Sequence, residues 1–293
     1  MSRTVAVVTP AFRAEATIIA TVRSLLEQDW RDWELWLVAD DGSDYEAFLN
    51  EAGIADERIR YLSSGGIGRG ASLARNVALD RITAPFVAIL DADDRMKPDK
   101  LARVVDALAA HPIVTTALDV MTEDFRHLRF VGHGPDRALT AGTHKWVSLS
   151  MDSMVAWDRR RTDARYDPTL SNMTDLELLL QLWQRAPSSM HLGTPLHDYI
   201  KRSQSMSNGK DVAAGMIRSK TEILRRLRQG YYALSDADVA GVAAFLEISL
   251  EAEQAYGGAV SANPGLLFED HLEPRLRAAR SDMNADERKL IEG

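Results

Sequence analysis

Short apolar runs alternate with amphipathic helical patterns over the first third of the chain. Apolar runs at residues 4–9, 34–38, 60–62 and 86–90 predict strands, and the last of these has no polar position, which predicts burial on both faces. Apolar residues at helical spacing between them predict helices at 15–28, 45–52 and 71–81. This alternation predicts an α/β fold with a mainly parallel sheet that helices cover.

The pattern is less regular in the rest of the chain. It predicts a helix from Pro98, strands at 112–120 and 125–131, a helix around 145–149, a strand at 154–157 and a strongly apolar helix at 174–183. Beyond about residue 210 it predicts helices at 216–227, 236–255 and 272–279. Breaks are expected at Gly257-Gly258 and at Asn263-Pro264-Gly265.

Composition narrows the classes of partner and chemistry. The chain has 35 basic and 43 acidic residues, and its net charge of −8 argues against a nucleic-acid partner. It contains no cysteine, which excludes disulfides, thiol nucleophiles and cysteine-based metal sites. No apolar run approaches the roughly 20 residues of a membrane span, and the opening residues do not resemble a signal peptide. We therefore expect a cytoplasmic chain, at most peripheral to the inner face of a membrane.

A run of carboxylates, Asp91-Ala92-Asp93-Asp94, follows the buried strand at 86–90 directly. Open α/β sheets bind ligands at the carboxyl ends of their strands, and carboxylate oxygens there suit Mg²⁺ or Mn²⁺ that carries a diphosphate. Alternation along an extended segment directs Asp91 and Asp93 to the same side, and we take Asp93 as the direct metal ligand. In isolation, such a triplet is more often an acidic turn that precedes a helix.

Three other polar segments are expected at the same edge of the sheet. Thr9-Pro10-Ala11-Phe12, with Glu15, ends the first strand, and its aromatic ring could stack on a nucleobase or fill the core. Asp40-Asp41-Gly42-Ser43 ends the second strand, where a carboxylate could accept from a base or a ribose, or cap a helix. Arg75 could reach the cleft from its helix or stay a solvated surface charge.

In order and spacing, these motifs over residues 4–104 resemble those of the family 2 glycosyltransferases, inverting enzymes of the GT-A (nucleotide-diphospho-sugar transferase) fold. The resemblance implies a mixed, mainly parallel sheet flanked by helices. It implies a catalytic domain at 1–207, with a nucleotide-binding half at 1–104 and an acceptor half at 105–207, followed by a helical extension at 208–293. The residues implied to bind the nucleotide are Pro10, Phe12, Asp40 and Arg75 at the base and Asp91 at the ribose, with Asp93 holding Mg²⁺ or Mn²⁺.

Two further positions follow from the resemblance in the second half. The general base of the family is an aspartate at the start of an apolar helix, which here is Asp175, with Thr174 in place of the usual glutamate. The alternative is that Thr174 or Asp175 only caps the N-terminus of this helix. Arg202 stands where a histidine often meets the diphosphate, and a guanidinium suits that role, although an edge strand with charges facing water is the alternative.

The resemblance implies transfer of a sugar, most simply from a UDP-sugar, to a hydroxyl of a carbohydrate or lipid-linked acceptor in polysaccharide biosynthesis. A non-catalytic nucleotide-binding relative is one alternative. A nucleotidyltransferase is another, but it needs a basic, Gly-rich opening loop that Ala11-Phe12-Arg13-Ala14 does not supply.

Two more patterns carry structural predictions. The cluster Gly65-Gly66-Ile67-Gly68-Arg69-Gly70 lacks the spacing of a phosphate-binding loop and predicts a flexible connection. The apolar stripe of the helix at 236–255 predicts either core packing or the seam of a homodimer.

Overall fold

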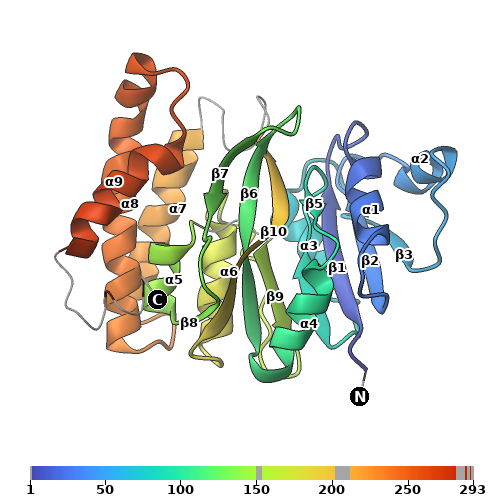
Figure 1. Ribbon diagram of the computed structural model, residues 1–293, viewed down its shortest axis with the longest axis horizontal. Helices are drawn as coiled ribbons and strands as arrows, with labels where there is room; N and C mark the ends of the chain where they lie inside the picture. Colours follow the sequence, from blue (N-terminus) through green and yellow to red (C-terminus); the bar gives the residue numbers. More distant parts are fainter. Residues whose placement is uncertain (1, 150–153, 202–211, 282–287, 289–290, 292–293) are drawn as a thin grey trace.

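The protein, seen here in a computed structural model that describes residues 2–149, 154–201, 212–281, 288 and 291, is built around one mixed sheet (Figure 1). Its strand order is β3-β2-β1-β4-β9-β6-β10-β5, with β7 paired to β6 and β8 paired to β10. The strands are β1 Val5–Ala11, β2 Trp33–Ala39, β3 Ile59–Ser63, β4 Phe86–Ile89, β5 Arg95–Met96, β6 Ile113–Thr122, β7 His127–Val131, β8 Arg137–Leu139, β9 Val155–Asp158 and β10 Ser189–Lys201.

Pairing differs between the two halves of the sheet. The strands β3, β2, β1 and β4 are all parallel, as the alternation of the first third predicts. In the second half, β9 runs antiparallel to both β4 and β6, while β6 and β10 are parallel. The predicted α/β class with a mixed sheet is confirmed.

Helices cover both faces of the sheet. They are α1 Ile18–Leu26, α2 Tyr45–Glu51, α3 Ala71–Leu79, α4 Lys100–Ala110, α5 Ala141–Val147, α6 Thr174–Trp183, α7 Val212–Arg228, α8 Asp236–Ala262 and α9 Phe268–Ser281. Alternation along β1 sends Val5 and Val7 into a core with α1 and α4, and Ala6 and Val8 into a core with α3 and α6. One strand therefore contributes to both cores.

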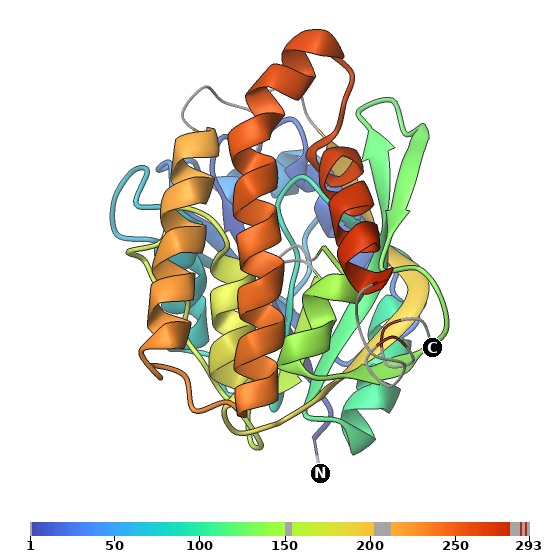
Figure 2. The ribbon, with the colours of Figure 1, turned by 90° about the vertical axis from the view of Figure 1, so that its left-hand side faces the viewer.

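The three C-terminal helices lie side by side, with α8 between α7 and α9 and packed on α5 (Figure 2). Apolar side chains of all three belong to the same core as α3 and α6, among them Leu227, Leu246 and Leu276. The predicted stripe of α8 packs into this core through its buried members Val242 and Leu246. The stripe is thus covered within one chain, and a homodimer through these helices stays a prediction of the sequence.

Three sequence expectations differ from the structure. The sequence predicts no strand over most of β10, which is a 13-residue strand between β6 and β5. The edge-strand alternative at Arg202 lies outside the described residues. Helix α5 begins at Ala141 instead of near residue 145, with Thr140 and Thr143 forming a capping box. The break expected at Gly257-Gly258 is wrong, because α8 continues to Ala262 and ends before Asn263.

Candidate functional site

The carboxyl ends of β1, β2 and β4 lie at one edge of the sheet, and they bring the opening motifs together. Because β1 lies between β2 and β4 and runs parallel to both, the loop after β1 is flanked by Asp40 on one side and Asp91 on the other. The sequence segments that follow these strands therefore meet, as the strand-end argument predicts.

Asp40 is buried and organises the glycine cluster around itself. Its Oδ1 accepts hydrogen bonds from Ser64 Oγ (2.6 Å) and Arg69 N (3.0 Å), and its Oδ2 accepts one from Gly70 N (2.8 Å). Gly68 N also donates to the Asp40 carbonyl, at 2.7 Å. The predicted flexible connection is therefore a loop fixed by Asp40. A carboxylate oxygen can accept two hydrogen bonds, so Oδ2 has capacity for a ligand donor.

Phe12 lies on the surface beside this loop. Its side chain is 46% exposed, so it does not fill the core. A Cβ built on Gly68 would come within 3.9 Å of Phe12 Cε2, which places the ring against the Asp40 loop. The exposed ring therefore offers a flat apolar face at the rim of this loop.

Asp41 fastens the loop after β1 to the end of β2. Its carboxylate accepts from Arg13 N at 2.5 Å, from Tyr45 Oη at 2.8 Å and from Ser43 N at 2.9 Å. Burial opposes ionisation of Asp41, but these hydrogen bonds outweigh it and lower its pKa below the ordinary value.

The remaining predicted residues of this loop have different surroundings. Glu15 accepts from Ser43 Oγ at 3.1 Å and is exposed, while Pro10 is a partly buried residue of β1 paired with Val38.

Arg75 is a buried cation and not the surface charge of the alternative interpretation. It is 3% exposed, and its Nη2 lies 2.5 Å from Asp91 Oδ1. Its guanidinium carbon lies 4.9 Å from the centre of the Tyr166 ring. A buried arginine that pairs with a carboxylate is firmly oriented, because the planar fork fits the carboxylate and the ring covers it.

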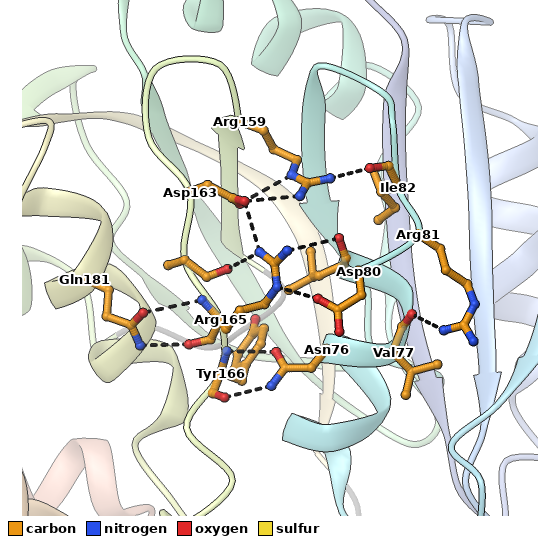
Figure 3. A network of polar contacts seen from close by, with 12 residues as sticks. Asn76, Val77, Asp80, Arg81, Ile82, Arg159, Asp163, Arg165, Tyr166 and Gln181 are labelled. Carbon is orange, nitrogen blue, oxygen red and sulfur yellow. Dashed lines mark hydrogen bonds and ion pairs between the residues drawn. The ribbon is translucent and has the colours of Figure 1, made fainter.

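The segment that carries Tyr166 is bound to α3 by a polar network (Figure 3). Asn76 holds the Tyr166 backbone in both directions, through Nδ2 to the carbonyl at 2.8 Å and through Oδ1 to the amide at 2.9 Å. Arg165 binds Asp80 at 2.8 Å and Asp163 at 3.0 Å. The network holds the segment around Tyr166 against the helix that presents Arg75.

The acidic loop contains carboxylates in three different surroundings. Asp94 is buried, Asp91 is engaged by Arg75, and Asp93 is partly exposed. Within the described part of the chain, no group of three His, Asp or Glu side chains is arranged to enclose a metal ion. The donor set fits a cation that one or two carboxylates hold and that completes its shell with diphosphate oxygens and water, as Mg²⁺ does. Asp93, the ligand expected from the sequence, is partly exposed, which is compatible with this role.

Asp175 is the second residue of α6, and it does not cap that helix. The N-cap is Met173, in the left-handed region at φ 59°, and makes no side-chain capping bond. The Asp175 carboxylate is 13% exposed, and Lys145 Nζ of α5 lies 3.7 Å from its Oδ2. Lys145, whose side chain is 4% exposed, therefore lies beside Asp175 in the first turn of α6.

Arg202 lies outside the described residues, so its position is not described. Two residues near the predicted set were not expected from the sequence, Lys145 at Asp175 and Tyr166 at Arg75. Neither has a local sequence signal, because each partner lies dozens of residues away along the chain.

Comparison with known proteins gives a consistent picture. Residues 6–148 match the family model described as "Glycosyl transferase family 2". TuaG of Bacillus subtilis, whose name assigns it as a glycosyltransferase of teichuronic acid biosynthesis, is 30% identical over 215 residues, which are 72% of this chain and 84% of TuaG. The Escherichia coli UDP-Glc:alpha-D-GlcNAc-diphosphoundecaprenol beta-1,3-glucosyltransferase WfgD is 35% identical over 109 residues, 37% of this chain and 42% of WfgD.

Solved structures share the fold. S. aureus TarS 1-349, in complex with UDP-GlcNAc, superposes with a TM-score of 0.66 at 17% identity, covering 98% of this chain and 84% of that one. The mannosyltransferase PcManGT from Pyrobaculum calidifontis, in complex with GDP-Man and Mn²⁺, gives a TM-score of 0.58 at 14% identity, covering 98% and 83%. No helix in the described ranges is both long and apolar enough to cross a bilayer. Together with the match to most of TuaG, the family model establishes that this chain is a glycosyltransferase and belongs to glycosyl transferase family 2.

Proposed function

We propose that this glycosyltransferase moves a sugar, with inversion, from a UDP-sugar to an acceptor hydroxyl. The observation that carries the proposal is the ion pair of buried Arg75 with partly exposed Asp91, at the same sheet edge as the Asp40 loop, the exposed ring of Phe12 and the partly exposed Asp93. Along the sheet from β2 to β4, this edge offers a buried carboxylate acceptor, an aromatic face and an oxygen ligand. The UDP-GlcNAc in TarS supports a uridine donor.

The donor would lie across these residues. Phe12 offers a stacking face to the uracil, and Pro10 and Arg75 line the same end. Asp40 Oδ2 accepts from the base, Asp91 accepts from the ribose, and Asp93 holds Mg²⁺ or Mn²⁺ at the diphosphate. The Mn²⁺ in PcManGT supports the cation. When bound, such a cation supplies positive charge that neutralises the leaving diphosphate.

Transfer would be a single displacement with Asp175 as the base. The acceptor oxygen bonds to the anomeric carbon from the face opposite the diphosphate, and its proton passes to the Asp175 carboxylate. The bond from the anomeric carbon to the diphosphate oxygen breaks, and UDP leaves with the electron pair. Lys145 Nζ lies 3.7 Å from Asp175 Oδ2 and would help to hold this carboxylate in position.

Asp175→Asn tests the base assignment. The amide keeps the shape of the side chain but cannot take the proton, so we expect kcat to fall by about 10²- to 10⁴-fold while Mn²⁺–UDP binding stays the same. Turnover would be measured as UDP release from UDP-glucose and UDP-GlcNAc with Mn²⁺ and saccharide acceptors. Asp236→Asn, at the exposed first residue of α8, is the control and should keep turnover. Unchanged kcat in Asp175→Asn would favour the non-catalytic alternative or another base.

The acceptor we propose is a lipid-linked saccharide. WfgD and a Campylobacter jejuni relative, 28% identical over 101 residues, both carry a diphosphoundecaprenol acceptor in their names. Such an acceptor would place the enzyme at the cytoplasmic face of a membrane. The comparison to make is turnover with a sugar on a short prenyl diphosphate against the same sugar free in solution; equal turnover would reject the lipid-linked acceptor.

A further inference from the structure

A chain of three buried titratable side chains lies directly behind the acidic loop. Asp94, His197 and Lys100 are 1%, 0% and 2% exposed. His197 Nε2 lies 2.9 Å from Asp94 Oδ2, and His197 Nδ1 lies 2.9 Å from Lys100 Nζ. The proposed reaction uses none of the three. They come from the acidic loop, from β10 and from the first residue of α4.

The directions of these hydrogen bonds follow from their chemistry. An ionised carboxylate only accepts, so His197 Nε2 carries the hydrogen. Burial, with Lys100 adding to it, holds the pKa of His197 well below its ordinary value, so the ring is neutral. Its Nδ1 then has a free lone pair that accepts from Lys100 Nζ, which can donate in either protonation state. Each member thus has one consistent role.

The chain fixes the acidic loop to the end of β10. Asp94 Oδ1 accepts from Ile200 N at 3.0 Å, while Oδ2 is held by His197. His197 pairs with Met96 in the short ladder between β10 and β5. Asp94 therefore binds β10 at two points, and it follows Asp93 directly in the sequence. Movement of this carboxylate would move Asp93 with it.

We propose that Asp94, His197 and Lys100 form a positioning unit that sets the geometry of Asp91 for the ribose and of Asp93 for the cation. The identity of the ligand in this inference, a nucleotide diphosphate with its cation, rests on the proposed function. The three residues do not touch the donor; they act through the loop. Outer-shell groups that hold a metal ligand change metal affinity or activity by about 10- to 100-fold when they are removed.

The same strand provides a matched control. His191 of β10 is also 0% exposed and makes two hydrogen bonds, with Thr115 Oγ1 at 3.0 Å and with the Gly132 carbonyl at 2.6 Å. Its partners belong to β6 and to the chain after β7, not to the acidic loop. A change at His191 therefore removes a buried histidine with two partners but leaves the Asp94 bonds in place.

The experiment compares His197→Leu, His197→Gln and His191→Leu. For His197→Leu we expect Mn²⁺–UDP binding, measured by calorimetry, to weaken about 10- to 100-fold. Amide hydrogen exchange in residues 91–96 and 198–201 should become faster even without ligand. His197→Gln keeps a side-chain amide that can donate to Asp94, so it should recover most of the binding. His191→Leu should lose stability and leave both readouts near wild type.

The outcomes separate this inference from the proposed function. If His191→Leu and His197→Leu have equal effects on binding and exchange, the unit is only part of the core and the inference is wrong. If wild type does not bind Mn²⁺–UDP, the proposed function fails, while the exchange of residues 91–96 still decides whether the unit holds the loop. Should His197→Leu fail to fold, Lys100→Met replaces it, and unchanged exchange in that variant would overturn the proposal.

Discussion

At the scale of single residues, the carboxylates that follow β2 and β4 differ in burial, and the buried ones have a different role from the partly exposed ones. Asp40 and Asp94 are buried, and each accepts hydrogen bonds from backbone amides, so both hold loops in place. Asp91 is oriented by Arg75, and Asp93 is partly exposed. A cation that arrives with its nucleotide needs an oxygen that solvent can reach, which favours the partly exposed Asp91 and Asp93 over the buried Asp94.

Asp93→Asn should therefore weaken Mn²⁺-dependent UDP binding with little change in stability. Loss of the ligand charge is expected to weaken binding at least about tenfold, or about 1.4 kcal/mol. Calorimetric titration of UDP with and without Mn²⁺ measures it. Asp99→Asn, at the start of α4, is the nearby control and should bind as wild type. Equal binding by Asp93→Asn and wild type would show that another group holds the cation.

Strand-end reasoning predicted which residues of the first third would come together, because parallel strands bring their carboxyl ends to one edge. It predicted that Asp40 and Asp91 lie at the same edge, and the structure places them on either side of the loop after β1. It could not predict that Asp40 would bind the glycine cluster, since hydrogen bonds to backbone amides leave no pattern in the sequence. The contacts of Lys145 with Asp175 and of Tyr166 with Arg75 could not be predicted either, because tertiary packing sets these partners.

At the scale of elements, α6 is anchored by a buried carboxylate next to the candidate base. Glu177 is 1% exposed and accepts from Gln181 Nε2 at 2.7 Å and from Tyr232 Oη at 3.3 Å, with Arg226 Nη1 3.8 Å away. Burial, with repulsion from Asp167 adding to it, raises the pKa of Glu177 above its ordinary value of 4.5 despite these partners. The fold therefore favours the protonated form.

This raised pKa predicts a pH dependence of stability. The folded state binds the proton more tightly than the unfolded state, so the stabilisation from Glu177 is full below pH 4.5 and is lost as the pH rises through the folded pKa. Between pH 4 and pH 7 the urea midpoint of Glu177→Gln should therefore rise relative to that of wild type.

Glu222 provides a control, because its pKa shift is opposite in direction to that of Glu177. Hydrogen bonds from Arg225 and Arg226 lower the pKa of Glu222 to about 2. Its stabilisation is present above pH 4.5 and is lost as the pH falls toward 2, so Glu222→Gln should lose stability relative to wild type at neutral pH. The same sign for both variants would contradict this assignment.

The sequence predicts elements with strong apolar periodicity well. It does not predict elements whose pattern is interrupted by glycine or proline. Helix α6 has the bounds that its apolar run predicts, 174–183. The long strand β10 was missed because Gly193 and Pro195 interrupt its alternation, and its ladder with β6 shifts register at that place. Helix α8 runs through Gly257-Gly258 because a glycine costs only about 1 kcal/mol in a helix, and it ends where Asn263-Pro264 follows.

At the scale of the whole molecule, the C-terminal helices and the sheet share a core. Ile223, Val242 and Leu272, one from each of α7, α8 and α9, belong to the cluster that also holds Val8 of β1. On the other face, Val7 of the same strand belongs to the second cluster. Loss of either core therefore disturbs β1.

This sharing predicts one cooperative unfolding transition, although the chain is longer than most two-state domains. Leu246→Ala in the first core and Leu35→Ala in the second should each cost about 2–5 kcal/mol. Each should shift the urea transitions seen by tryptophan fluorescence and by far-UV circular dichroism together, because Trp157 and Trp33 report on different cores. If Leu246→Ala instead splits the curve into two transitions, with the Trp33 core unfolding later, residues 208–293 and the sheet are separate units, and the shared core does not couple them.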